Sequence, residues 1–337
     1  MTISGQLGDR IRRRLCALQD HILDRLMEAR AAGARDFARI SAVTPSDIIY
    51  RVDRISEQAV ESWLERHWSA AWPVEIVMEG REPGQTFPPG LPLNKTRYKL
   101  ILDPIDGTRN LMYDKRSAWT LAGLAPQRGG RTHLGDIAVA AMTELPTSKQ
   151  ERSDQFSAVR GCGRGGIVGE SIDLRPGGKR RRLPVRPSSA TDCLGGFASI
   201  SRFFPDGKTL LAGFEEELWR RLYGRAGQAA PAVFEDQYIS TGGQLHELIA
   251  GHDRLIADLR PLAFRRLGLA SPLVCHPYDI CTGLILQEAG GRVETPEGRR
   301  LSAPLDAISP VAWVGYANPV LARKIRPVLR RLVREML

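Results

Sequence analysis

The feature that most constrains the fold is a largely apolar run, residues 98–102, that ends in two carboxylates three positions apart. Such a run predicts a buried strand. Asp103 and Asp106 follow it, with Pro104 between them and Gly107 after them. Proline fixes its own φ and favours extended backbone in the residue before it, and glycine permits a tight turn. The segment therefore predicts two acids at the carboxyl end of a strand, followed by a tight turn.

Two carboxylates in this position suit a hard cation, because Mg²⁺ prefers oxygen ligands in near-octahedral geometry. Backbone amides after Gly107 are placed to bind an anion beside such a cation. The competing interpretation is an ordinary surface turn, since Asp, Pro and Gly are the usual turn residues.

Three further acids adjoin predicted elements. Residues 74–79 alternate in polarity and predict a strand ending at Glu79, with Glu82 and Glu75 as rivals for the strand-end position. Asp53 and Asp279 each precede a helical pattern, where capping of free amides alone would explain an aspartate.

The string DPIDGTRN at positions 103–110 resembles the inositol monophosphatase family signature, D-P-[IL]-D-G-T-x-N. A second pair of strings, YDICTG at 278–283 and EAGG at 288–291, resembles the family's W-D-x-A-A-G and E-A-G-G. The strings DIIYRVD at 47–53 and MEG at 78–80 resemble D-x-V-T-x-x-D and G-E-E, with departures at Tyr50, Met78 and Gly80. This resemblance spans most of the chain. It implies an α/β (α+β) fold, a layered α-β-α-β-α sandwich of the inositol monophosphatase and fructose-1,6-bisphosphatase type.

The resemblance also implies a site with two or three Mg²⁺ ions, held by Glu79, Asp103, the Ile105 carbonyl, Asp106, Asp279 and Asp53. Asp103 would bridge two ions and the Ile105 carbonyl would bind one of them. Asp106 and Asp279 would hold the second ion, Glu79 would hold the first, and Asp53 would approach an additional ion.

The catalytic and substrate-binding roles come from the same resemblance. The amides of Gly107 and Thr108 would hold phosphate oxygens, and Asp279 would also contact substrate. Glu79 and the Thr108 hydroxyl would orient a metal-activated water that attacks phosphorus directly, with Asp103 as the third catalytic residue. No covalent phosphoenzyme is implied.

The expected function is therefore hydrolysis of a phosphomonoester by a lithium-sensitive, cytoplasmic homodimer. The first expected substrate is an inositol monophosphate or a sugar phosphate. The alternatives are a 3′(2′),5′-bisphosphate nucleotidase and a fructose-1,6-bisphosphatase. An alternative of another class is a phosphate-ligand-binding protein with weakened turnover, because Met78 and Gly80 replace two residues of the family pattern.

Composition excludes several other classes. The chain has 337 residues and a net charge of +10, which attracts anions in general. Its five cysteines are scattered, which argues against a disulfide framework and suits a reducing compartment. The sequence has no stretch of about 18 apolar residues, so it predicts no transmembrane helix. The basic cluster at 179–182 lacks interleaved aromatic residues, which favours a solvated hairpin over nucleic-acid binding.

We expect one catalytic domain, residues 1–337, with an N-terminal lobe (1–187) and a C-terminal lobe (188–337). Residues 7–26 predict an amphipathic helix, and residues 80–96 predict an extended loop that acts as a mobile flap. Residues 240–249 predict a capped helix, with Ser240 or Thr241 as the cap. We expect Pro327 to kink or divide the last amphipathic segment.

Overall fold

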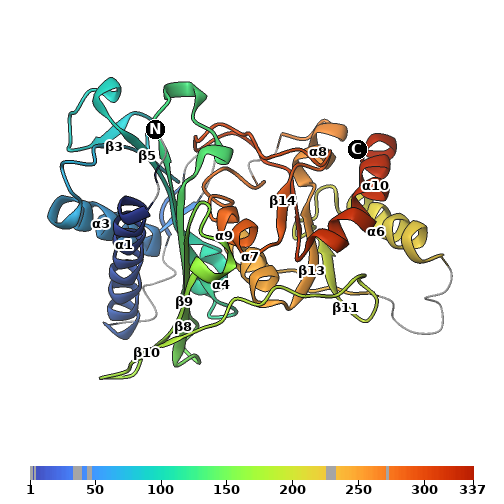
Figure 1. Ribbon diagram of the computed structural model, residues 1–337, viewed down its shortest axis with the longest axis horizontal. Coiled ribbons are helices and arrows are strands. Elements are labelled where there is room, and N and C mark those ends of the chain that lie inside the picture. Colours follow the sequence, from blue (N-terminus) through green and yellow to red (C-terminus); the bar gives the residue numbers. More distant parts are fainter. Residues whose placement is uncertain (1–2, 4, 33–39, 44–47, 225–232, 271–272) are drawn as a thin grey trace.

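A computed structural model describes residues 3, 5–32, 40–43, 48–224, 233–270 and 273–337, with backbone only at 40–43 and 48–51. The described residues form five layers, which confirms the predicted α-β-α-β-α sandwich (Figure 1). Two N-terminal helices cover one face of an eight-stranded sheet. Two further helices lie between this sheet and a five-stranded sheet, and three helices cover the remaining face.

The eight-stranded sheet has the order β10-β9-β8-β7-β6-β5-β3-β4 and is antiparallel except for the β3–β5 pair. Its strands are β3 (Val74–Met78), β4 (Gln85–Phe87), β5 (Tyr98–Asp106), β6 (Ala118–Pro126), β7 (Val139–Leu145), β8 (Arg152–Val159), β9 (Val168–Asp173) and β10 (Arg180–Arg182). Its connections contain short helices: η1 (Leu93–Lys95), α4 (Thr108–Met112), η2 (Gly129–Arg131), η3 (Leu134–Asp136) and α5 (Gly163–Gly166).

The predicted N-terminal helix is α1 (Gly5–Ala32), which packs on the eight-stranded sheet beside α3 (Arg51–His67). Its apolar stripe is buried, as the spacing of three and four residues requires. The stripe also holds one polar side chain, Gln19, whose Nε2 donates to the carbonyls of Thr120 (3.1 Å) and Ala141 (2.8 Å). A short ribbon, β1 (Ile40–Val43) and β2 (Ile48–Tyr50), precedes α3. Position 47, the first of the string DIIYRVD, lies outside the described residues.

The five-stranded sheet has the order β12-β11-β13-β15-β14. Its strands are β11 (Gly196–Ile200), β12 (Val233–Phe234), β13 (Asp253–Asp258), β14 (Arg292–Glu294) and β15 (Trp313–Tyr316). The helices α7 (Thr241–Ala250) and α9 (Gly283–Glu288) pack between the two sheets, and the outer helices are α6 (Lys208–Tyr223), α8 (Arg260–Arg266) and α10 (Pro319–Met336). The division into two lobes at residue 188 stays a prediction.

Two predictions about local structure need correction. Helix α10 is one element that runs through Pro327, so the segment is not divided there, and a kink at Pro327 stays a prediction. Pro327 is exposed, and water can bind the carbonyl that its missing N–H leaves unpaired. Residues 80–96 are not loop throughout, because β4 adds an antiparallel edge strand to β3 and pairs Phe87 with Val74, and their role as a mobile flap stays a prediction.

The basic cluster lies where the sequence predicts, on the exposed hairpin of β9 and β10. Arg180 forms ion pairs with Asp20 (2.7 Å) and Glu170 (2.9 Å). Within the described ranges, no helix is both long and apolar enough to cross a bilayer.

Candidate metal centre

Three aspartates converge between the two sheets. Asp103 and Asp106 lie in the last part of β5, and Asp279 lies in the turns that lead into α9. One carboxylate oxygen of each aspartate lies within 4.8 Å of the other two. Asp103 and Asp106 are buried and Asp279 is half-buried. The structure therefore brings together three of the four strongest predicted metal ligands.

Strand β5 leaves regular pairing with β6 within the predicted signature. The register shifts between Asp103 and Asp106, and the Ile105 amide turns back to donate to Asp103 Oδ1 at 3.0 Å. Gly107 follows with φ of 90°, a left-handed conformation that favours glycine. A Cβ at this position would lie 3.0 Å from Ser240 Cβ. The predicted tight turn is confirmed, and it lies against the start of α7.

The start of α7 holds Asp106 in place. The Ser240 hydroxyl donates to Asp106 Oδ2 at 2.8 Å, and the Gly242 amide donates to the same oxygen. Ser240 is also the helix N-cap, since its hydroxyl oxygen accepts from the Gly243 amide at 2.9 Å. The sequence predicted the cap but missed the contact with Asp106, because nothing local links residues so far apart in the chain.

Asp279 is held by the turn that precedes α9. Its Oδ2 accepts from the His276 amide at 2.6 Å, and its own amide donates to the His276 carbonyl at 3.1 Å. Helix α9 begins at Gly283, so the prediction that Asp279 starts the helix is wrong. The intervening residues form turns closed by bonds between residues three apart, such as the Gly283 amide to the Ile280 carbonyl.

Glu79 lies directly after β3, which pairs in parallel with β5, and it is half-buried. Its charge contributes to raising the pKa of Asp103, so it faces the aspartate cluster. Glu82 is exposed. Glu75 is engaged elsewhere, because its carboxylate lies 3.1 Å from Lys99 Nζ and accepts from Gln127. Among the three rivals, Glu79 has the position of a fourth ligand, and its role stays a prediction.

Thr108 connects the signature to the remaining predicted ligand. Its hydroxyl donates to the Ile105 carbonyl at 3.0 Å and lies 3.4 Å from Asp53 Oδ1. Asp53 lies in the first turn of α3, as predicted. Glu79, Asp103, Asp106, Thr108 and Asp53 therefore lie at the ends of β3, β5 and α3 that meet, and Asp279 joins them from the turns before α9.

The electrostatics of the cluster call for a cation. Burial raises the pKa of Asp103 well above its ordinary value, and the charges of Glu79, Asp106 and Asp279 add to this. Burial and then the charge of Asp279 raise the pKa of Asp106 to about 7, although the Gly242 amide opposes the shift. Buried carboxylates that repel one another are stabilised by a bound cation, and oxygen-only ligands fit Mg²⁺. The residues present therefore fit the expected metal.

A pH dependence of stability follows for the metal-free protein. The pKa of Asp106 rises from 3.8 to about 7 on folding, so folding favours the protonated carboxyl. This contribution is full below pH 4 and is lost as the pH rises through 7. We expect Mg²⁺ to raise the melting temperature more at pH 8 than at pH 5, with EDTA as the reference. In Asp106→Asn this difference should shrink, and an equal Mg²⁺ effect at both pH values in the wild type would contradict the account.

The sequence matches no protein-family model and no curated protein. Solved structures, in contrast, match nearly the whole chain. The extragenic suppressor protein SuhB of Bartonella henselae superposes with a TM-score of 0.61 at 18% identity, covering 97% of this chain and 100% of that chain. A Pyrococcus horikoshii protein with similarities to inositol-1 monophosphatase superposes with a TM-score of 0.59 at 14% identity, covering 98% of this chain and 99% of that chain.

The fold is that of the inositol monophosphatases and fructose-1,6-bisphosphatases. An inositol monophosphatase from Zymomonas mobilis gives a TM-score of 0.55 at 17% identity, covering 98% of this chain and 100% of that chain. A fructose-1,6-bisphosphatase from Leishmania major gives a TM-score of 0.63 at 13% identity, covering 96% of this chain and 93% of that chain. At these sequence identities the similarity shows the fold alone. The chemistry of the site must be inferred from the residues of this chain.

Proposed function

We propose that this protein is a metal-dependent phosphomonoesterase that acts on a small phosphorylated metabolite. The observation that carries the proposal is the convergence of Asp103, Asp106 and Asp279 from distant parts of the chain into one buried cluster. The fold supports it, because phosphatases are among the solved structures that share this architecture. The formal charge of +10 favours an anionic substrate.

Mg²⁺ is the proposed metal, in two or three sites. Asp103 would bridge two ions, Asp106 and Asp279 would hold one, and Glu79 with the Ile105 carbonyl would hold the other. Asp53 would approach a third. Bound Mg²⁺ would offset the clustered negative charge, polarise the phosphoryl oxygens and lower the pKa of a water molecule.

The chain's own groups then bind and orient the reactants. Gly107 and Thr108 open α4, and their amides would donate to phosphate oxygens. Glu79 would accept a proton from the attacking water, and the Thr108 hydroxyl would hold that water in line with phosphorus. Positioning by such groups contributes a large part of the rate enhancement in phosphoryl transfer. Since no side chain is required as a nucleophile, the proposal involves no covalent phosphoenzyme.

An inositol monophosphate or a sugar phosphate is the proposed substrate, and a 3′(2′),5′-bisphosphate nucleotide or fructose 1,6-bisphosphate is the alternative. A cytoplasmic homodimer is part of the same proposal. The five cysteines are all free, which suits a reducing compartment.

A screen of phosphate release with these four substrate classes tests the proposal. Phosphate release from one class that requires Mg²⁺ and stops on chelation is the expected result. If phosphate esters bind with measurable affinity but release no phosphate under any metal condition, the protein is a phosphate-ligand-binding protein instead.

Lithium is expected to inhibit this activity at millimolar concentrations. The reason is the Asp106–Asp279 pair, which matches the site of lowest metal affinity in the family that the sequence resembles. Initial rates at several substrate concentrations should show uncompetitive inhibition by LiCl, with KCl at equal ionic strength as the control. Rates that respond identically to the two salts would count against this assignment of the second metal position.

A further inference from the structure

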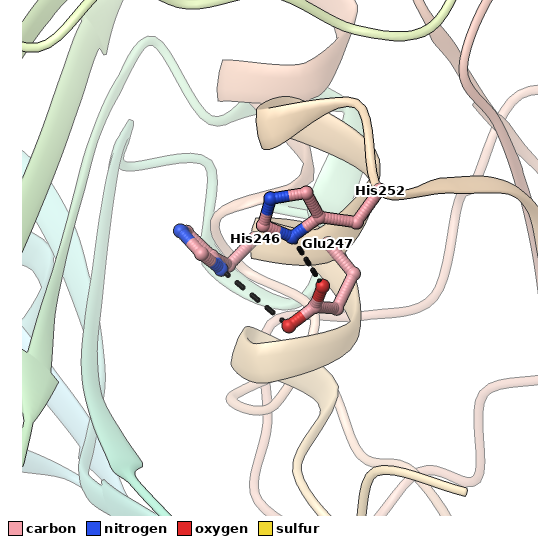
Figure 2. A group of neighbouring side chains, drawn as sticks. All are labelled: His246, Glu247 and His252. Atoms are coloured by element: carbon pink, nitrogen blue, oxygen red, sulfur yellow. Dashed lines mark hydrogen bonds and ion pairs between the residues drawn. The ribbon is translucent and has the colours of Figure 1, made fainter. Parts of the chain in front are cut away.

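A second group of potential ligands lies at the other end of α7. His246 and Glu247 lie in the last turns of the helix, and His252 follows it (Figure 2). His246 Nδ1 lies 3.8 Å from Glu247 Oε1, and His252 Nδ1 lies 2.6 Å from Glu247 Oε2. One ligand atom from each residue lies within 4.8 Å of the other two. Both imidazoles thus direct Nδ1 toward one carboxylate.

The backbone at the end of α7 creates this convergence. Gly251 caps the helix in a left-handed conformation with φ of 87°, and its Cβ would lie 2.3 Å from the Arg186 carbonyl oxygen. The His252 amide donates to the Glu247 carbonyl at 2.9 Å. The chain therefore folds back over the last helical turn and carries His252 onto Glu247. Glycine is required here both for its conformation and for the close approach of a neighbouring segment.

We propose that His246, Glu247 and His252 form a separate binding site for a transition-metal dication such as Zn²⁺. Two imidazole nitrogens and one carboxylate oxygen are a common zinc ligand set, whereas Mg²⁺ favours oxygen alone. Tetrahedral zinc with bonds of about 2.1 Å places its ligand atoms about 3.4 Å apart. The separation of 3.8 Å between His246 Nδ1 and Glu247 Oε1 is close to that value. His252 Nδ1 lies 2.6 Å from the other oxygen, Oε2, and must move away by somewhat less than 1 Å, which its 59% exposed side chain permits.

The surroundings of His246 orient its ring for this role. The ring packs against Trp119 at 4.8 Å and Phe156 at 5.8 Å between ring centroids. Its other nitrogen, Nε2, faces Asp154 Oδ2 at 3.9 Å. A carboxylate on the far side of an imidazole favours a proton on that nitrogen and leaves the near nitrogen available to a metal. Asp154 lies beyond hydrogen-bond distance, so only its negative charge favours the tautomer in which Nε2 carries the proton and Nδ1 is the ligand.

The charges around the cluster also favour a dication. Arg116 opposes one, because its Nη2 lies 3.6 Å from Glu247 Oε1. Arg116 is held by other partners, however: its Nη1 lies 2.8 Å from Asp236 Oδ2, and its guanidinium lies 3.7 Å from the centre of the Tyr238 ring. The charges of Glu247 and Asp236, after burial, raise the pKa of nearby Asp253 to about 7. Glu247 and Asp236 thus share one arginine, with Asp253 nearby, and a dication held by neutral histidines would offset the remaining negative charge.

The alternative is a hydrogen-bonded pair with no metal. Glu247 raises the pKa of His252 through their hydrogen bond, so a protonated His252 paired with Glu247 accounts for the 2.6 Å contact. In this alternative both histidines interact with Glu247, and although burial raises the pKa of its carboxyl, these contacts lower it. The alternative predicts that the protein retains no zinc, which makes the two interpretations separable.

The test measures zinc retention by chelator-treated, tag-free protein. Excess Mg²⁺ is present to saturate the aspartate cluster, and the protein is equilibrated with Zn²⁺ or Co²⁺ and analysed for metal content. We expect one tightly bound transition metal ion per chain at this site. Bound Co²⁺ should give a visible absorption spectrum typical of coordination by nitrogen ligands. The affinity should fall at least tenfold in His252→Ala and in His246→Ala. Because His252 is exposed, its variant should fold even if the packed His246 variant does not.

Two controls make the result specific. His133→Ala removes a histidine beside a single carboxylate, Asp136 at 3.3 Å, and should leave zinc retention unchanged. Asp103→Asn, which alters the aspartate cluster, should also retain this metal. No zinc retained by the wild type, or equal retention in wild type and His252→Ala, would overturn the proposal.

Discussion

Asp103→Asn should reduce Mg²⁺-dependent phosphate release by about a thousandfold or more while the protein stays folded, because a metal supplies several kcal/mol of transition-state stabilisation. Asp103 is buried at the centre of the cluster, and its pKa responds to Glu79, Asp106 and Asp279. The carboxamide keeps the shape but loses the charge that would bridge two cations. The measurements are the initial rate across a Mg²⁺ titration and the melting temperature in EDTA.

The matched control is Asp206→Asn, which neutralises an exposed aspartate outside the cluster. It should leave the rate and its Mg²⁺ dependence unchanged. Near-normal activity in folded Asp103→Asn would rule out the assignment of two metals bridged by this residue.

Glu79→Gln is expected to lower kcat by roughly 10²- to 10⁴-fold, the range for losing a group that handles a proton in the transition state. It should also weaken activation by Mg²⁺, with a smaller effect on KM. The expectation rests on position, since Glu79 follows the strand beside β5 and acts electrostatically on Asp103.

Glu82→Gln is the comparison variant, because Glu82 lies three residues later and is exposed. It should change KM slightly or not at all. If the two variants exchange these effects, the assignment of Glu79 is wrong by three residues.

The central site was predictable because its residues carry strong local signals. A buried run that stops at Asp103, a proline and a glycine place two acids at a strand end without any knowledge of the rest of the chain. Asp279 was found through a second string, and the structure brings it within 4.8 Å of Asp106. The apolar stripe of α1 was equally clear, since its spacing defines one buried face.

What the sequence did not predict depends on contacts between distant segments. Ser240 and Gly242 bind Asp106, and no local pattern of residues 240–244 indicates that partner. The start of α9 was misplaced, because turns with bonds between residues three apart precede the helix and have similar residue preferences. The edge strand β4 was missed because prolines and glycines surround its three residues.

The cluster at the end of α7 was missed for another reason. His246 and His252 are six residues apart, which is not a spacing that places two side chains on one face of a helix. They meet because the chain reverses at Gly251. Only the conformation of that one glycine joins the three residues into a group.

A crystal structure with Mn²⁺ in place of Mg²⁺ and inorganic phosphate tests the central claim most directly. Anomalous scattering identifies Mn²⁺ independently of any assumption about the site. The account predicts Mn²⁺ between Asp103, Asp106 and Asp279, with a phosphate beside the amides of Gly107 and Thr108. Active protein whose Mn²⁺ lies away from these aspartates would contradict it.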